Sequence, residues 1–171
     1  MAMRSGTIPS TVEAVAERSD TLFPCARTRP AGQGCHGRFF RMRLLRLFAD
    51  DEGESHSEDV EIPFEEVDDY FDNTPPVWFS SFEAASEYGF ERVPPGWVGS
   101  WHPAPQRVLA IYLSGQLEIE ASDGEVRPIG PGTILLAEDT TGKGHRNRVS
   151  SPTELEMVFI TLPDKAPDDP T

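Results

Sequence analysis

Side chains that can transfer protons or bind ions gather in one segment of the 171-residue chain, between Glu138 and His145. Asp139 follows Glu138, and Lys143 lies between two glycines. Imidazole titrates near neutral pH, so His145 can act as a general acid or base. An ammonium group on a glycine-flanked loop can hold a carboxylate or phosphate, and when desolvated it can act as a base. This segment is therefore the first candidate for a site.

The same segment also has plainer interpretations. Lys143 can be an exposed lysine of a glycine-rich turn. Glu138 and Asp139 can bind a metal, pair with Lys143, or cap the loop through backbone N–H groups. His56, in an acidic turn, is expected to be structural or exposed. The sequence has no glycine-rich phosphate loop, no Ser-His-Asp arrangement and no zinc-finger spacing.

The charge of the chain excludes several classes of partner. Twenty-nine acidic residues against 15 basic ones give a net charge of −14. Proteins that bind nucleic acid or an anionic membrane surface need clustered Lys and Arg, so neither partner is expected. With 37% hydrophobic residues the chain can still bury a core.

The chain divides at Met42 into two unlike parts. Residues 1–41 carry a net charge of +3, and residues 42–171 carry −17. The first part shows no apolar periodicity, and we expect a disordered extension that lies upstream of a true start at Met42. Residues 42–162 are expected to form one domain, and residues 163–171, rich in Pro and Asp, a disordered acidic tail.

Both cysteines, Cys25 and Cys35, belong to the extension. They can form a disulfide or bind a metal with His36, but no second Cys/His pair completes either site. The extension lacks the apolar stretch of a secretory signal, and no segment approaches the length of a membrane span. The sequence therefore predicts a cytoplasmic protein.

In the segments that must position the candidate residues, apolar and polar residues recur with a period of two, which is typical of half-buried strands. About nine or ten short strands are expected, with turns such as Pro94-Pro95-Gly96 and Asp123-Gly124 between them. A surface turn or a single helical turn is expected over 64–72, and a short helical turn over 83–89. The fold class is therefore all-β, a sandwich or barrel. The strands are expected at 44–48, 59–62, 77–82, 90–93, 107–114, 116–121, 125–129, 133–137, 145–149 and 155–162.

Two motifs resemble those of the cupins, which are jelly-roll barrels. The spacing before Gly115 resembles the first cupin motif, with His102 at its first histidine place. The segment 140–145 resembles the second motif, with Thr140 in place of proline and His145 as its histidine. The phrases at 53–56, 96–105 and 138–145 are similar to those of small single-domain bacterial cupins. This resemblance implies a cupin β-barrel over 42–162.

The resemblance also implies a degenerate metal site. A metal-dependent cupin holds Fe, Mn, Ni or Zn with three histidines and one carboxylate. Here Ala104 and Val108 replace two of those ligands, so that His102 and His145 remain. Glu138, Asp139 or His56 can supply a third ligand. We expect one divalent metal or none, with His102, His145 and Glu138 as its ligands.

The same resemblance places the function inside the barrel. If His102 points inward, residues at two-residue steps from it share that face, which gives a mostly apolar pocket with a few polar groups. His102 and His145 can otherwise be buried, hydrogen-bonded histidines. The catalytic candidates are His102, His145, Lys143 and Tyr112. The ligand-binding candidates are Trp101, Gln106, Val108, Ala110 and Asp139.

The resemblance implies an enzyme that acts on a small organic molecule, for which an anion is one candidate. Isomerase, cyclase, epimerase or lyase chemistry needs only positioned acid and base groups or a metal. A ligand-binding or sensing cupin without catalysis is the first alternative, and a metal-dependent dioxygenase is the second. Such barrels commonly pair, so a homodimer is expected.

Overall fold

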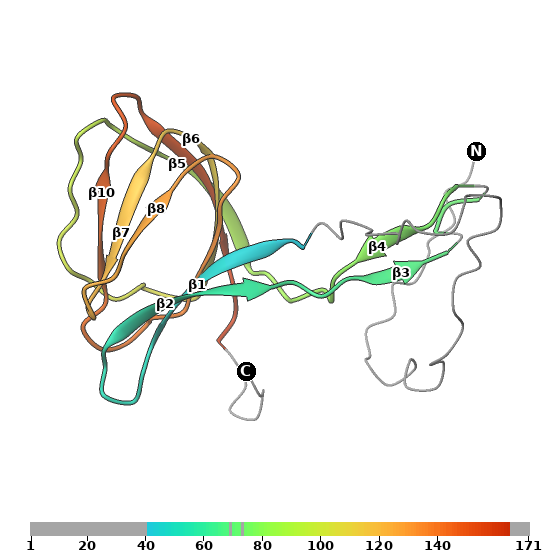
Figure 1. Ribbon diagram of the computed structural model, residues 1–171, viewed down its shortest axis with the longest axis horizontal. Coiled ribbons are helices and arrows are strands. Elements are labelled where there is room, and N and C mark those ends of the chain that lie inside the picture. The colour runs from blue at the N-terminus through green and yellow to red at the C-terminus, as the bar shows by residue number, and fades with distance from the viewer. Residues whose placement is uncertain (1–40, 69, 73, 165–171) are drawn as a thin grey trace, which may run out of the picture. The chain divides into compact units, whose positions relative to one another are not determined.

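The computed structural model describes residues 41–68, 70–72 and 74–164. All of its regular elements are strands, which confirms the all-β prediction (Figure 1). The strands are β1 Arg43–Ala49, β2 Ser55–Glu61, β3 Glu65–Val67, β4 Val77–Phe79, β5 Glu87–Val93, β6 Val108–Ser114, β7 Leu117–Ala121, β8 Val126–Ile129, β9 Ile134–Ala137, β10 His145–Val149 and β11 Leu155–Thr161. The described part of the chain forms no helix that could span a membrane.

Two sheets enclose the core of the barrel. Six strands pair in the order β2-β1-β9-β6-β11-β5, and three pair in the order β10-β7-β8. Only the β1–β9 pair within these sheets is parallel among the described strands. Alternate residues of both sheets meet in one apolar cluster that includes Leu47, Ala110, Ile119 and Leu155. This packing follows from the period of two, because every second side chain of a strand faces the same side.

The two outermost strands of the six-stranded sheet, β2 and β5, carry charged side chains. On β2 these are Glu58, Asp59 and Glu61, all exposed. On β5 they include Glu87 and Glu91. Both outer strands therefore carry exposed acidic side chains.

Two local predictions were wrong. Residues 64–72 were expected to form a turn, but Glu65–Val67 is a strand that pairs antiparallel with β4. Opposite residues of this ribbon pair Glu66 with Trp78, and such cross-strand pairs stabilise a short strand that has no alternation of its own. The helical turn expected over 83–89 is also absent from the described residues, where β5 begins at Glu87.

Most of the other expected strands are confirmed to within a few residues, and β2 begins four residues earlier than expected. The expected extension, its cysteines and His36 lie outside the described residues, as does most of the tail. Met42 immediately precedes β1. That the native protein starts at this residue stays a prediction.

Candidate functional site

A buried carboxylate fixes one of the two motif histidines. Asp139 follows β9 by two residues, is fully enclosed, and lies with Oδ2 2.6 Å from Nδ1 of His145. A carboxylate only accepts hydrogen bonds, so Nδ1 of His145 carries the proton and Nε2 keeps its lone pair. The second oxygen of Asp139, Oδ1, is buried without a hydrogen-bond partner among the described residues. Asp139 thus fixes the orientation of the His145 ring and leaves Nε2 as the nitrogen that can exchange a proton.

His102 lies directly beside His145. Each of the two residues donates its backbone N–H to the carbonyl of the other, at 2.9 and 3.0 Å. Nδ1 of His102 is 2.7 Å from the carbonyl oxygen of Ser100, which can only accept, so Nδ1 of His102 also carries a proton and Nε2 is the free nitrogen of the neutral ring. The ring centroids are 4.8 Å apart and the rings are inclined by 50°. His102 is half-buried and His145 is buried, so His102 is the more accessible base.

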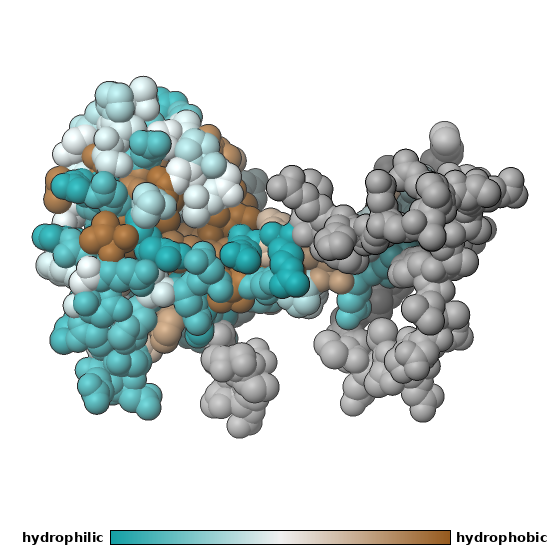
Figure 2. Space-filling view, viewed as in Figure 1, coloured by the Kyte–Doolittle hydropathy of each residue, from teal (hydrophilic) through white to brown (hydrophobic). Residues whose placement is uncertain are grey.

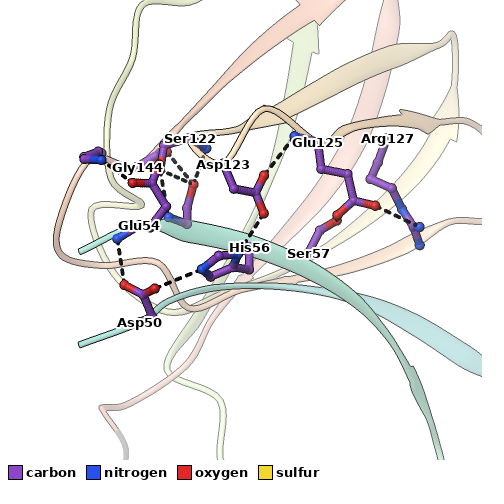
Figure 3. A network of polar contacts seen from close by, with 11 residues as sticks. Asp50, Glu54, His56, Ser57, Ser122, Asp123, Glu125, Arg127 and Gly144 are labelled. Carbon is purple, nitrogen blue, oxygen red and sulfur yellow. Dashed lines mark hydrogen bonds and ion pairs between the residues drawn. The ribbon is translucent and has the colours of Figure 1, made fainter. Parts of the chain in front are cut away.

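Gly144 brings the two histidines together. Its φ of +72° is a conformation that glycine adopts without strain, and a Cβ at this position would overlap the carbonyl group of His102. The carbonyl oxygen of Gly144 accepts a 2.6 Å hydrogen bond from Oγ of Ser55, which is fully buried. Ser55 in turn accepts from the backbone N–H of Ser122 at 2.6 Å (Figure 3). Three loops are therefore tied to the loop that carries His145.

His56 links two turns at the same end of the barrel, on its outer surface. Its Nδ1 lies 2.7 Å from Asp123 and its Nε2 lies 3.0 Å from Asp50 (Figure 3). Hydrogen bonds to Asp50 and then Asp123 raise the pKa of His56 above its ordinary value. The contact with His56 is also the main reason why the pKa of Asp50 is lowered. His56 joins the β1–β2 turn to the β7–β8 turn, which agrees with the structural role expected for it.

Lys143 is not a free cation. Its ammonium forms an ion pair with Glu54, and this contact raises the pKa of Lys143. A lysine whose pKa is raised stays protonated at neutral pH, so the ion pair with Glu54 favours an anion-binding role of Lys143 over a general base, and its catalytic role stays a prediction. Its side chain is exposed, and an anionic ligand would have to displace Glu54 from it.

Glu138 lies away from the imidazoles, in contrast to its expected place among the metal ligands. Its buried carboxylate is held by Arg46 at 2.7 Å and by Arg107 at 2.6 Å. Consecutive residues of an extended chain point to opposite sides, so Glu138 and Asp139 cannot both face His145. Among the described residues, no three His, Cys, Asp or Glu side chains form a group that could hold a metal ion. Two histidines without a third ligand do not fit a resident divalent metal.

Tyr112 is buried in the core, far from the histidines. Val108 pairs with Ala137, and Tyr112 lies four residues beyond Val108 in the direction opposite to Asp139. At about 3.4 Å per residue, six residues along the sheet separate Tyr112 from Asp139 by about 20 Å. Burial raises the pKa of Tyr112, so its phenol stays protonated. Tyr112 is therefore not part of a site built on His145.

The prediction of which residues face the barrel interior is correct in part. Ala104, Val108 and Ala110 are buried, as the two-residue steps predict. Gln106 was expected among them and is exposed, because the chain bends after Pro105 and the alternation stops there. Val108 and Ala110 belong to the apolar core cluster.

Trp101 directly precedes His102 in the sequence and lies at the surface. It is 44% exposed, and its ring lies under the guanidinium of Arg146, 5.2 Å from the ring centroid. This is the geometry of a cation–π contact. Arg146 also pairs with Glu120 on the outer face of the barrel, so Trp101 is engaged outside the core.

Sequence reasoning missed Ser55 and Ser122 as positioning residues. Ser55 belongs to the phrase 53–56 that carried the resemblance, but nothing in its spacing indicates its hydrogen bond to Gly144, 89 residues away. A signal did exist for Asp139. Leu135 and Ala137 are inward-facing residues of an apolar strand, and one further step of two gives Asp139.

Comparison with solved structures finds cupin domains among the similar chains. The cupin domain of Bordetella pertussis shares 23% identity over 45% of this chain and 80% of its own, with a TM-score of 0.37. A cupin superfamily protein of Desulfitobacterium hafniense shares 19% over 50% of this chain and 73% of its own, with a TM-score of 0.38. The cupin domain of Schizosaccharomyces pombe Cnp3 shares 11% over 72% and 84%, with a TM-score of 0.39.

The chain is similar in fold to cupin domains. This is the fold that the two sequence motifs predict. No protein-family model and no curated protein matches the sequence.

Proposed function

We propose that His102, His145 and Asp139 form a proton-transfer site for a small organic molecule. The observation that carries this proposal is the 2.6 Å contact of the fully enclosed Asp139 with Nδ1 of His145, beside a second imidazole in the same tautomer. Reactions of the isomerase, epimerase, cyclase or lyase type need this kind of positioned base and no oxidant.

The chemistry requires only one proton to move. Nε2 of a histidine takes a proton from an acidic C–H or O–H of the substrate and becomes an imidazolium. His102, the more exposed of the two, is the first to meet a substrate. Asp139 stabilises the charge when the proton reaches His145, because the imidazolium then faces a buried carboxylate. The imidazolium exchanges its proton with solvent and returns a proton to the substrate, and the base is restored.

Proton exchange with solvent tests this function even while the substrate is unidentified. The full chain is incubated in D₂O with a panel of 2-hydroxy acids, 2-keto acids, aldoses and ketoses, and deuterium incorporation is followed by mass spectrometry. We expect incorporation into at least one compound, and a loss of about 10²-fold or more in His102→Gln or His145→Gln. His56→Gln is the matched control and should retain the exchange.

A non-catalytic binding role makes a different prediction. A compound that raises the melting temperature of the protein but shows no exchange would indicate a binding or sensing domain. Equal exchange by the wild type and by both histidine variants would contradict the proposal. The dioxygenase alternative needs a metal site that the described residues do not form.

A further inference from the structure

Two buried side-chain oxygens of the described residues have no hydrogen-bond partner, and both belong to neighbours of His145. One is Oδ1 of Asp139, whose other oxygen contacts the His145 ring at 2.6 Å. The other is Oδ1 of Asn147, two residues beyond His145 on β10. The side chains of the buried residues Ser55 and Ser151 are hydrogen-bonded. Unpaired buried oxygens are rare in folded proteins, so two of them around one histidine call for a functional reason.

The side chain of Asn147 faces the interior of the barrel, on the same side of β10 as His145. Successive residues of a strand point to opposite faces, and Arg146 and Arg148 are exposed and paired with glutamates of β7. Asn147 lies opposite Ile119, which is buried in the core. Hydrophilic residues cover much of the barrel surface seen in Figure 2, where water can pair with them. Asn147 instead places a carboxamide beside the apolar core, about 7 Å along the strand from His145.

The unpaired oxygen of Asn147 does not hold the described part of the fold together. Because no described residue pairs with Oδ1, this atom joins no two elements of the barrel. A leucine has nearly the same size and shape as an asparagine, and it would leave no oxygen unpaired. A polar side chain at a place where an apolar one would be at least as stable is typical of a group that binds a ligand.

We propose that Asn147 selects the substrate by hydrogen bonds to an α-hydroxycarbonyl group, an inference that rests on the proton-transfer function proposed above. Both unpaired oxygens are acceptors, so the groups that complement them are donors such as hydroxyls. A histidine removes a proton from carbon readily only where a neighbouring carbonyl makes the C–H acidic. A molecule that meets both requirements carries a hydroxyl next to a carbonyl.

A carboxamide suits this group because it offers an acceptor and donors on one side chain. Oδ1 of Asn147 accepts a hydrogen bond from the substrate hydroxyl, and Nδ2 donates to the carbonyl oxygen. When Nε2 of His102 or His145 takes the C–H proton, the C–H electron pair passes to that oxygen as an enolate, and the donated bond becomes stronger. A proton returned by the imidazolium restores the carbonyl compound. Asn147 is thus a specificity-determining residue, and the proton moves only through the histidines.

Two ketones of nearly equal size test this selection with the full chain. Hydroxyacetone carries a hydroxyl where 2-butanone carries a methyl group, and deuterium exchange of their α-hydrogens in D₂O is followed by mass spectrometry and divided by the rate in buffer alone. We expect the wild type to favour hydroxyacetone by at least about 10-fold, and Asn147→Leu to reduce this preference to about 2-fold or less. Gln116→Leu removes an exposed amide and is the matched control, which should keep the preference. A wild type without preference, or an Asn147→Leu variant with an unchanged one, would overturn the inference.

Urea denaturation separates selection from a structural role of the same residue. Asn147→Leu should be at least as stable as the wild type, because the change removes an unpaired buried oxygen. A variant that loses both its stability and its preference would show that Asn147 holds the fold, and would overturn the inference.

Binding is measured apart from catalysis by NMR of the ¹⁵N-labelled His102→Gln chain. Hydroxyacetone should shift the side-chain amide signals of Asn147, assigned through Asn147→Leu, and leave those of Gln116 in place. This shift without any exchange by the wild type would support the selection and contradict the proton-transfer function. Exchange by the wild type with no shift at Asn147 would overturn the inference and leave the function intact. The absence of both would contradict both.

Discussion

Asp139 holds Nδ1 of His145 at 2.6 Å from a position that solvent does not reach. This relationship gives two adjacent residues of one loop opposite roles. Asp139 turns inward and orients a base, whereas Glu138 turns outward and joins two arginines. Substitutions in this loop and around it separate these roles from each other.

Replacement of Asp139 by Asn should change the tautomer of His145. The amide can donate its N–H to Nδ1, which would move the imidazole proton to Nε2 and remove the base. We expect the ring ¹⁵N signals of His145 to show this exchange of protonation and any proton-transfer activity to fall by about 10²-fold or more. Asp123→Asn, which alters a carboxylate beside His56, should leave the His145 signals unchanged.

Unchanged His145 signals in Asp139→Asn would show that Asp139 does not set the tautomer. A loss of activity with no change in these signals would point to a structural role of Asp139 instead. The ring signals thus separate a positioning role from a general loss of stability.

Gly144→Ala should be much more destabilising than Gly124→Ala. Both glycines have a positive φ, +72° and +92°, which costs an alanine about 1 kcal/mol. Only at Gly144 would the new Cβ overlap the backbone of His102, whereas at Gly124 nothing lies within 4 Å. We expect a loss in the free energy of unfolding of about 3 kcal/mol or more for Gly144→Ala, measured by urea denaturation. Equal losses in the two variants would show that the close approach of the two loops is not needed.

Glu138→Gln should lower stability without affecting the histidines. Its carboxylate is 6% exposed and balances two partly buried arginines, of which Arg46 keeps its pair with Glu58, so its loss should cost about 1–3 kcal/mol. Glu61→Gln removes a partner of Arg41 in an exposed pair and should cost less than about 1 kcal/mol. Denaturation curves of both variants measure the difference. If Glu138→Gln instead abolished metal binding at unchanged stability, Glu138 would be a ligand after all.

The contribution of His56 to stability should depend on pH. Its pKa is raised in the folded protein, so its stabilising effect is complete below the ordinary value of about 6.5 and is lost as the pH rises through the higher folded value. The side chain is about one third exposed, which limits the effect to about 1 kcal/mol. We expect the wild type to exceed His56→Gln in free energy of unfolding at pH 5.5–6, and the difference to shrink towards pH 9. A difference that stays constant over this range would contradict the assigned role of the two carboxylate contacts.

Much of the barrel could be predicted from sequence because its strands are alternating or continuously apolar runs and because glycine-containing turns separate them. The strands from β6 to β11 have this character, and the turn at Gly124 has the expected positive φ. The ribbon of β3 and β4 could not be predicted, because three-residue strands rich in acids have no alternation to detect. Its formation depends on a partner strand ten residues further along the chain.

The site was predicted less completely than the fold. The resemblance to cupins singled out His102 and His145, which the structure does bring together. Tyr112 seemed to share their face, but a common face extends along a whole strand, and about 20 Å separates this residue from Asp139. Which of the two carboxylates, Glu138 or Asp139, faces the histidines depends on the direction in which each side chain points. That direction follows from Ala137, one residue before them, whose burial only the fold reveals.

The acidic residues on β2 and β5 also affect whether strands of further molecules can add to the six-stranded sheet. A sheet with bare edges can add strands from further molecules without limit, which leads to filaments and precipitates. Here both outer strands carry charged side chains, with Glu58, Asp59 and Glu61 in ion pairs on β2 and Glu87 and Glu91 on β5, and an added strand would have to accommodate these charges. Charged side chains on the outer strands therefore disfavour the addition of further strands at either end of the sheet.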